Sequence, residues 1–280
     1  MVEVKLLEHL RDNDRENKKN IVRIKEYFHF RNHLWIVFEM LSLNLYDFIK
    51  DNQYRGFSVP LTRRFAIQIL ISLIYMKEHK IVHWDLKPEN ILLRKINKTG
   101  IKLIDFGSSW FEQEKIYSYI QSRFYRAPEI ILGIPYTTAI DMWSFGWILY
   151  ELFSGYPLFA GENENEQLQW IMELRGVPPL SVLALAPRRK NFFDNNYKPI
   201  LVENSRGKIR TPGKKNLKDL MNWEDEAFVD FISKCIEWKV EDRMTPENAQ
   251  QHEWIREGLR EIAQENMRQQ NNSTNAETQG

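Results

Sequence analysis

The stretch His83-Trp84-Asp85-Leu86-Lys87-Pro88-Glu89-Asn90 decides the fold class of this 280-residue chain. It places a carboxylate, an ammonium group and an amide close together in the sequence. Two shorter motifs follow it, Asp105-Phe106-Gly107 and then Ala127-Pro128-Glu129. A lone Asp-Phe-Gly carries almost no information, but the seven fixed residues of the first motif have a chance frequency of roughly one in a billion per starting position. Coincidence of all three motifs in this order is therefore negligible.

The chemistry of these side chains suits the transfer of a phosphoryl group. The Asp85 carboxylate can accept the proton of a substrate hydroxyl, and Asn90 can reach back over a tight loop to a metal ion. Lys87 lies between them and can neutralise charge on the transferring phosphoryl group. Asp105, in a turn after a strand, can hold the metal that bridges nucleotide phosphates.

The three motifs resemble the protein kinase set H-x-D-L-x-x-x-N, D-F-G and A-P-E. The resemblance implies an α+β, protein-kinase-like fold with a mostly helical large lobe. It also implies that the nucleotide is ATP and the metal ion Mg²⁺. By position, it makes Phe38 the gatekeeper behind the adenine and places Glu39 and Leu41 in the hinge, whose backbone groups bind the base. Leu92 matches the floor under the adenine ring. Each of these four residues could equally be plain strand core.

A narrower resemblance rests on YSYIQSRFYRAPE (117–129), DFGSS (105–109) and FRNHL (30–34). On these residues the chain is similar to the dual-specificity tyrosine-phosphorylation-regulated kinases, the DYRK family, from Glu3 to about Trp254. The resemblance implies phosphorylation of serine and threonine in protein substrates, often next to a proline. It also implies autophosphorylation on the second tyrosine, Tyr119.

Two arginines close to Tyr119 fit a regulatory role. A phosphate on Tyr119 would carry close to two negative charges and three strong acceptor oxygens. Arg123 and Arg126 can form charge-assisted hydrogen bonds to such a phosphate and thereby order the loop. The alternative is that both arginines are merely solvated.

Two further pairings are expected to stabilise the protein rather than to act in catalysis. In kinases the glutamate at the position of Glu129 pairs with a late arginine, and Arg243 is the matching residue. Asp141 resembles the acid that ties a buried helix to the backbone of the catalytic loop.

Composition narrows the class of protein. Thirty-nine Lys and Arg against 38 Asp and Glu leave a net charge of +1, which gives no electrostatic case for nucleic-acid binding. The longest nearly apolar run, Phe65–Met76, is shorter than the ~18 residues of a membrane span. The first residues do not form a signal peptide. The single cysteine fits a reducing compartment. We expect a soluble cytoplasmic or nuclear enzyme, with no membrane partner and with its oligomeric state open.

The hydrophobic pattern predicts the order of the elements. We expect a helix in residues 1–10 and a hairpin whose strands, Ile21–Phe30 and His33–Glu39, meet at Arg31-Asn32. Further predicted elements are buried helices around Phe65–Met76 and Ala139–Phe153, short strands at Ile91–Leu93 and Ile101–Ile104, and a last helix from Thr245-Pro246 to about Leu259. The expected domains are a partial small lobe with the hinge (1–41), a large lobe (42–260) with an insert at about 176–222, and a disordered tail (261–280).

The chain departs from the kinase pattern at its start. Glu3 stands where kinases carry the glutamate that pairs with a strand lysine, and only Met1 and Val2 precede it. No G-x-G-x-x-G occurs in the sequence. We expect an N-terminally truncated kinase that lacks the first three strands, binds ATP weakly and turns over little. The alternative is a non-catalytic, pseudokinase-like binding protein.

Four of the nine tryptophans form a second departure: Trp35, Trp84, Trp110 and Trp147 stand where DYRK relatives often carry cysteine. An indole at Trp147 would overpack a buried helix at a typical cost of ~1–3 kcal/mol. One hypothesis is a gene in which UGA encodes cysteine, translated with a table that reads UGA as tryptophan.

Overall fold

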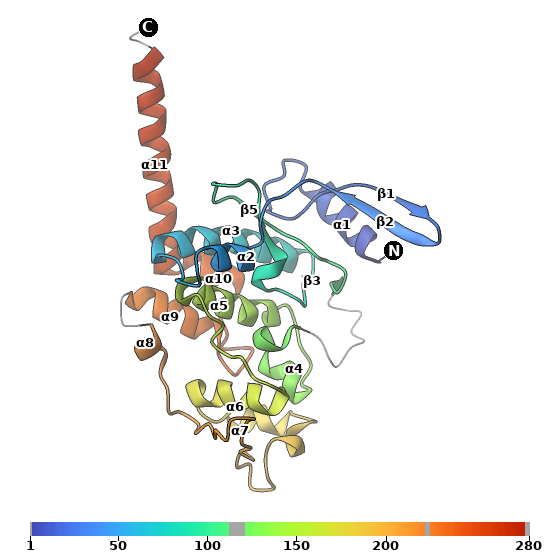
Figure 1. Ribbon diagram of the computed structural model, residues 1–280, viewed down its shortest axis with the longest axis vertical. Coiled ribbons are helices and arrows are strands. Elements are labelled where there is room, and N and C mark those ends of the chain that lie inside the picture. Colours follow the sequence, from blue (N-terminus) through green and yellow to red (C-terminus); the bar gives the residue numbers. More distant parts are fainter. Residues whose placement is uncertain (1, 112–120, 222–224, 278–280) are drawn as a thin grey trace.

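The computed structural model describes residues 2–111, 121–221 and 225–277. Its N-terminal part consists of α1 (Val2–Asn13) and an antiparallel hairpin of β1 (Ile24–Phe30) and β2 (His33–Phe38). Arg31 and Asn32 both have positive φ, 48° and 60°, which two-residue hairpin turns favour because this backbone matches the twist of the strands. The predicted helix, hairpin and partial small lobe are confirmed, and Figure 1 shows the hairpin extending beyond the helical body with α1 beside it.

Two short ladders position the motifs. β3 (Ile81–Val82) pairs with β6 (Trp110–Phe111), and β4 (Ile91–Leu93) pairs with β5 (Ile101–Leu103). Residues 83–90 connect β3 to β4, and residues 104–109 connect β5 to β6. Because both connections join the same two ladders, the first two motifs of the sequence meet at one place.

The large lobe is built around two buried helices, α3 (Val59–Glu78) and α5 (Ala139–Ser154), which pack against each other. Its other α-helices are α2 (Leu45–Asp51), α4 (Pro128–Leu132), α6 (Glu164–Arg175), α7 (Leu180–Ala184), α8 (Leu217–Leu220), α9 (Glu226–Cys235), α10 (Pro246–Gln251) and α11 (Glu253–Glu277). Short 3-10 turns occupy Pro88–Asn90, Arg123–Tyr125 and Arg189–Asn191. The mostly helical body expected from the sequence is confirmed.

Helix α3 has the length and apolar composition that could cross a membrane, the only such helix in the described ranges. In the structure, α5, α10 and α11 pack against it, and most of its apolar side chains are buried. A core helix of a folded protein has the same composition, so the burial of α3 accounts for its hydrophobicity.

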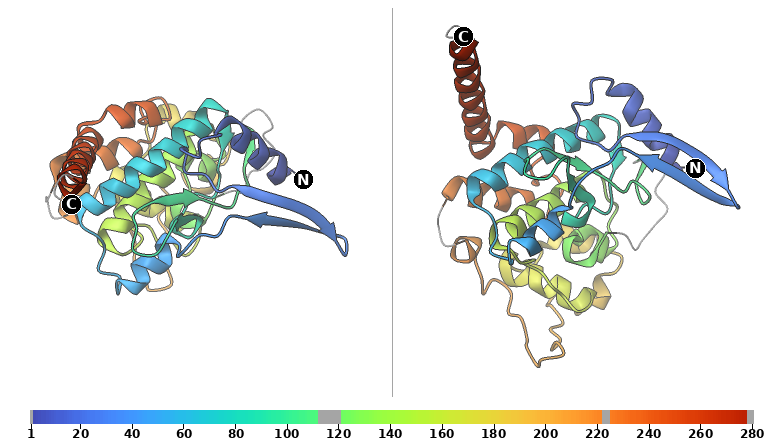
Figure 2. Two further views of the ribbon diagram at one scale, coloured as in Figure 1. Left: turned by 90° about the horizontal axis from the view of Figure 1, so that it is seen from above. Right: turned by 45° about the horizontal axis from the view of Figure 1, so that its top comes forward.

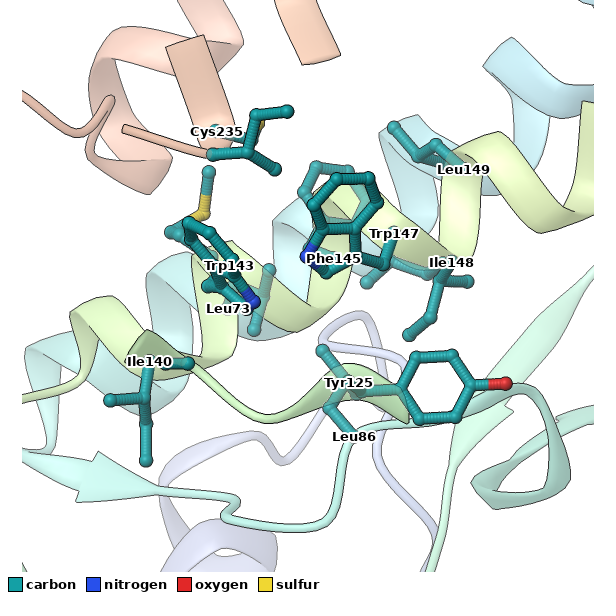
Figure 3. Close-up of a cluster of buried hydrophobic side chains, with 14 of the residues drawn as sticks. Leu73, Leu86, Tyr125, Ile140, Trp143, Phe145, Trp147, Ile148, Leu149 and Cys235 are labelled. Atoms are coloured by element: carbon teal, nitrogen blue, oxygen red, sulfur yellow. The ribbon is translucent and has the colours of Figure 1, made fainter. Parts of the chain in front are cut away.

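Aromatic side chains of α5 pack closely inside the core. Figure 3 shows Trp143, Phe145 and Trp147 of α5 in one cluster with Cys235 of α9. A Cβ added to Gly146 would lie 2.8 Å from the Cβ of Cys235, so only glycine permits this approach of α9. The Trp147 ring lies 4.0 Å from that of Phe159, centroid to centroid, which is closer than most aromatic pairs.

The C-terminal region differs from the sequence expectation. Thr245 caps α10 as predicted, accepting a hydrogen bond from the backbone N–H of Asn248 at 3.3 Å. The chain then bends at His252, and α11 continues to Glu277, as Figures 1 and 2 show. An ion pair between Arg64 and Glu265 attaches α11 to α3 beyond the predicted helix end. The prediction of a disordered tail from residue 261 is wrong as far as Glu277.

Candidate active site

Helix α5 holds the loop of residues 83–90 that follows β3. The Asp141 carboxylate accepts hydrogen bonds from the backbone N–H groups of His83, at 2.8 Å, and Trp84, at 3.2 Å. Trp84 has a φ of 70°, a backbone conformation that needs such support in a non-glycine residue. The predicted tie between Asp141 and the catalytic loop is therefore confirmed.

His83 joins this loop to the Asp-Phe-Gly motif. Its Nε2 lies 3.0 Å from the carbonyl oxygen of Ile104, and its ring packs against Phe106 at 5.0 Å between centroids. Burial lowers the pKa of His83, so the ring is neutral at pH 7 and Nε2 is the donor to Ile104. The two motifs are thereby fixed relative to each other.

Asp85 is surrounded by donors. Its Oδ2 accepts from Lys87 Nζ at 2.6 Å, and its Oδ1 accepts from Ser122 Oγ at 2.7 Å and Ser122 N at 3.1 Å. Burial acts to raise the pKa of Asp85, but the Lys87 and Ser122 hydrogen bonds and the Lys87 charge outweigh it and lower the pKa. Asp85 is therefore an oriented anion at neutral pH, and Lys87, which is predicted to neutralise charge on the transferring phosphoryl group, forms an ion pair with it.

Asn90 and Asp105 lie close together because the backbone N–H of Ile104 donates to the carbonyl oxygen of Asn90 at 2.9 Å. Asn90 Nδ2 donates to the carbonyl oxygen of Asp85 at 2.8 Å, which orients the amide and leaves its oxygen as a ligand. The Asp105 side chain is exposed, at a backbone φ of 61°.

The donor set fits magnesium. Mg²⁺ takes oxygen ligands and is held by one or two carboxylates together with substrate phosphates and water. Asp105 supplies a carboxylate and Asn90 an amide oxygen, so these two residues could hold the ion. In the described ranges no group of three or more His, Cys, Asp or Glu side chains could hold a metal, so no richer metal centre competes with this pair.

Helix α1 brings Glu3 to the same region. A Cβ on Gly107 would lie 3.6 Å from Glu3 Oε2 and 3.3 Å from Asp105 Oδ1, so both carboxylates lie close to Gly107. Burial and the negative charge of Asp105 raise the pKa of Glu3. A cation bound here would relieve this repulsion, which agrees with the predicted nucleotide-side position of Glu3.

The predicted adenine-site residues gather where the two lobes join. Phe38 ends β2, and Phe38 and Leu41 are partly buried against the core. The segment after Leu41 runs beside β4: Ser42 N donates to Leu93 O at 2.8 Å, and Asn44 forms a β-bridge with Leu92. The structure thus brings Phe38, Glu39, Leu41 and Leu92 to one junction, as a hinge and its floor require.

Gln121 and Ser122 hold the segment before Ala127-Pro128-Glu129 in place. The sequence alone predicted no role for either residue. Ser122 touches both Asp85 and Lys87, with its Oγ 3.2 Å from Lys87 Nζ. Gln121 donates to Ser144 Oγ at 3.0 Å and accepts from the backbone N–H of Ala127 at 2.8 Å. Both lie inside the motif 117–129, which is the stretch most specific to the DYRK resemblance. That motif was the feature of the sequence that could have pointed to them.

Arg123 and Arg126 both bond to protein groups, so the alternative that they are merely solvated is wrong. Arg126 is buried; it pairs with Glu164 at 3.1 Å and donates to the carbonyl oxygen of Gln121 at 2.8 Å. Arg123 donates to the carbonyl oxygen of Glu162 at 2.8 Å. Tyr119 lies outside the described residues, so its predicted phosphorylation stays a prediction.

The end of this segment is fixed by a buried ion pair. Arg243 binds both carboxylate oxygens of Glu129, at 2.6 and 2.9 Å, and neither side chain is more than 2% exposed. The predicted pairing is confirmed.

A cavity of about 460 Å³ is lined in part by Ser122, whose hydroxyl donates to Asp85. Glu89, Glu151 and several tyrosines line it. Tyr125 donates to Glu151 Oε2 at 2.5 Å, and burial raises the pKa of Glu151 to about 7. Two carboxyl groups among aromatic rings make this cavity suited to a cationic side chain.

Sequence comparisons with known proteins point to the same family as the arrangement of these side chains. A family described as the protein kinase domain matches residues 1–255. Dual specificity tyrosine-phosphorylation-regulated kinase 4 of Homo sapiens is 49% identical over 255 residues, which cover 91% of this chain and 49% of that protein. Probable serine/threonine-protein kinase dyrk2 of Dictyostelium discoideum is 50% identical over 256 residues, covering 91% of this chain and 28% of that protein. The chain spans about half or less of the length of these relatives.

Proposed function

Because the chain belongs to the protein kinase family, with DYRK kinases as relatives, we propose that it transfers the γ-phosphate of ATP to serine and threonine hydroxyls of proteins. The observation that carries the proposal is the ionised Asp85 carboxylate, held by Lys87 and Ser122 beside the Asn90 and Asp105 oxygens. A base, a cation and two metal-binding oxygens in one place are the parts that phosphoryl transfer needs.

The proposed step follows from the roles of these side chains. The substrate oxygen forms a bond to the γ-phosphorus, the bond from that phosphorus to the β,γ-bridging oxygen breaks, and ADP leaves. Asp85 orients the hydroxyl and receives its proton, while Lys87 offsets negative charge on the transferring group. Mg²⁺, when bound, neutralises the phosphate oxygens. The backbone of residues 39–41 holds the adenine.

The substrate side is proposed from the cavity next to Ser122. A protein segment entering it could place a basic side chain against Glu89 and Glu151 while its hydroxyl faces Asp85. Selection of sites followed by proline, and autophosphorylation on Tyr119, are proposed on the similarity to DYRK kinases alone.

The proposal is tested with Mg-ATP labelled on the γ-phosphate and a peptide containing Arg and Ser-Pro. We expect slow transfer of label to the peptide, because the sequence contains no G-x-G-x-x-G motif, and we expect Asp105→Asn to weaken Mg-ATP binding and transfer further. Asp51→Asn, at the exposed end of α2, is the matched control and should change neither. Binding of Mg-ATP without transfer by the unaltered chain would contradict the kinase proposal and favour a non-catalytic binding protein.

A further inference from the structure

Lys102 is the only lysine among the described residues that is buried, with 1% of its surface exposed. It lies in β5 between Ile101 and Leu103, which are also buried. Taking an ammonium group out of water costs several kcal/mol unless the group is paired and hydrogen-bonded. A lysine at this position therefore needs partners inside the protein.

Those partners belong to the hinge and to the loop between α1 and β1. The Lys102 Nζ forms an ion pair with Glu39 and donates to Asn17 Oδ1 at 2.7 Å. The same carboxylate oxygen of Glu39 accepts from the backbone N–H of Arg23 at 2.8 Å, and Glu39 N donates to Arg23 O at 3.1 Å. Glu39 is thus held through its backbone and through its side chain.

The location of Lys102 links it to the adenine site. In the β4–β5 ladder Lys102 is directly opposite Leu92, the predicted floor of that site. Opposite residues of an antiparallel pair project to the same face. The Lys102 side chain therefore starts on the face of Leu92 and ends at Glu39, where the hinge begins.

We infer that Lys102 is a positioning residue for nucleotide binding: through Glu39 it fixes the hinge backbone of residues 39–41 in the conformation that takes the adenine. This inference rests on the proposed function, because it assumes that the hinge binds adenine. Lys102 itself need not touch the nucleotide. Its effect is carried by the Glu39 side chain and by β4, which is bonded to the segment after the hinge through Ser42 N and Leu93 O and through the bridge between Asn44 and Leu92.

A purely structural role would give a different result in a double variant. Lys102→Met alone leaves the Glu39 carboxylate without its cation, which destabilises the protein. In Lys102→Met combined with Glu39→Met, two apolar side chains replace the pair, a change that is often neutral or stabilising. If the pair served stability alone, the double variant would regain both stability and nucleotide binding. A positioning role predicts that stability returns while binding stays weak.

The probe is adenosine, which carries the base without phosphates, measured by calorimetry and with the unfolding temperature of each variant. We expect the double variant, which also loses the bonds to the Arg23 N–H and to Asn17 Oδ1, to recover most but not all of the unfolding temperature lost in Lys102→Met. We expect it to bind adenosine roughly tenfold more weakly than the unaltered chain. Hydrogen exchange of the amides of residues 38–42 should be faster in the double variant without ligand. Lys98→Met, on the exposed turn after β4, is the matched control.

The outcomes separate the two proposals. Unchanged adenosine affinity and unchanged exchange in a folded double variant would overturn the positioning role of Lys102 and leave the kinase proposal intact. Failure of the unaltered chain to bind adenosine would refute adenine binding at the hinge and the inference with it.

Discussion

Replacing Arg243 by methionine tests whether the segment after the Asp-Phe-Gly motif is held by a buried charge pair. The Arg243 side chain is fully buried and binds both oxygens of Glu129. It also donates to the carbonyl oxygens of Ala139 and Glu237, each at 3.0 Å. Methionine has similar length and no charge, so the change removes these bonds with little loss of volume.

The expected loss of stability follows from the groups that Arg243→Met leaves without a partner. Glu129, 2% exposed, keeps a carboxylate with no counter-ion, and breaking a buried pair in this way costs about 3–5 kcal/mol of the free energy of unfolding. When Glu129→Met is added, no buried charge is left. The remaining cost is that of the two carbonyl groups that lose a donor, about 1 kcal/mol each. The double variant should therefore be about 1–3 kcal/mol more stable than Arg243→Met alone.

Urea unfolding followed by tryptophan fluorescence measures both values, and an unchanged dependence on urea concentration shows that the folded state is comparable. Arg256→Met, on the exposed face of α11, is the control and should change stability by less than about 0.5 kcal/mol. The reasoning would be refuted if Arg243→Met lowered the free energy of unfolding by less than about 1 kcal/mol, or if the double variant were as unstable as Arg243→Met alone.

Three further predictions concern the site and the core. Ser122→Ala removes the hydroxyl donor to Asp85, and steady-state assays should show kcat about tenfold lower with KM for ATP unchanged, whereas Ser122→Thr should keep most of the rate. Burial raises the pKa of Glu151 to about 7, so its neutral form stabilises the fold and this contribution is lost as the pH rises through 7. Urea unfolding at pH 5 and pH 8 should show that Glu151→Gln removes roughly 2–3 kcal/mol of that pH dependence; an equal dependence in both proteins would contradict this. Trp147 has no hydrogen-bond partner for its indole nitrogen among the described residues, and peptide masses from the native source should show cysteine at this position; a tryptophan mass would end the UGA hypothesis.

Local signals in the sequence predicted most of the fold. Two β-rich runs separated only by Arg31-Asn32 predicted the hairpin, and Asn32 is of a residue type that adopts the positive φ of such a turn readily. Continuous apolar stretches predicted α3 and α5, since only a buried helix can be apolar on every face. The length of α11 was missed because its polar residues carry no core pattern, and its attachment depends on the distant Arg64.

The sequence predicted those residues of the candidate site that belong to recognisable motifs. Asp85, Lys87, Asn90 and Asp105 are recognised by spacing, because their chemistry requires them close together in one loop or in the next. The contacts of Ser122 with Asp85 and of Lys102 with Glu39 join residues far apart in the chain. No spacing rule encodes such pairs, so they became visible only when the fold brought the segments together.

The measurement that tests the central claim most directly is the rate of label transfer from γ-labelled Mg-ATP to a Ser-Pro peptide by the unaltered chain and by Asp85→Asn. Asparagine keeps the shape of the side chain but cannot act as the base. The account predicts that kcat falls at least about 100-fold while Mg-ATP binding, measured separately by calorimetry, stays unchanged. Transfer at the same rate by the Asp85→Asn chain would contradict it.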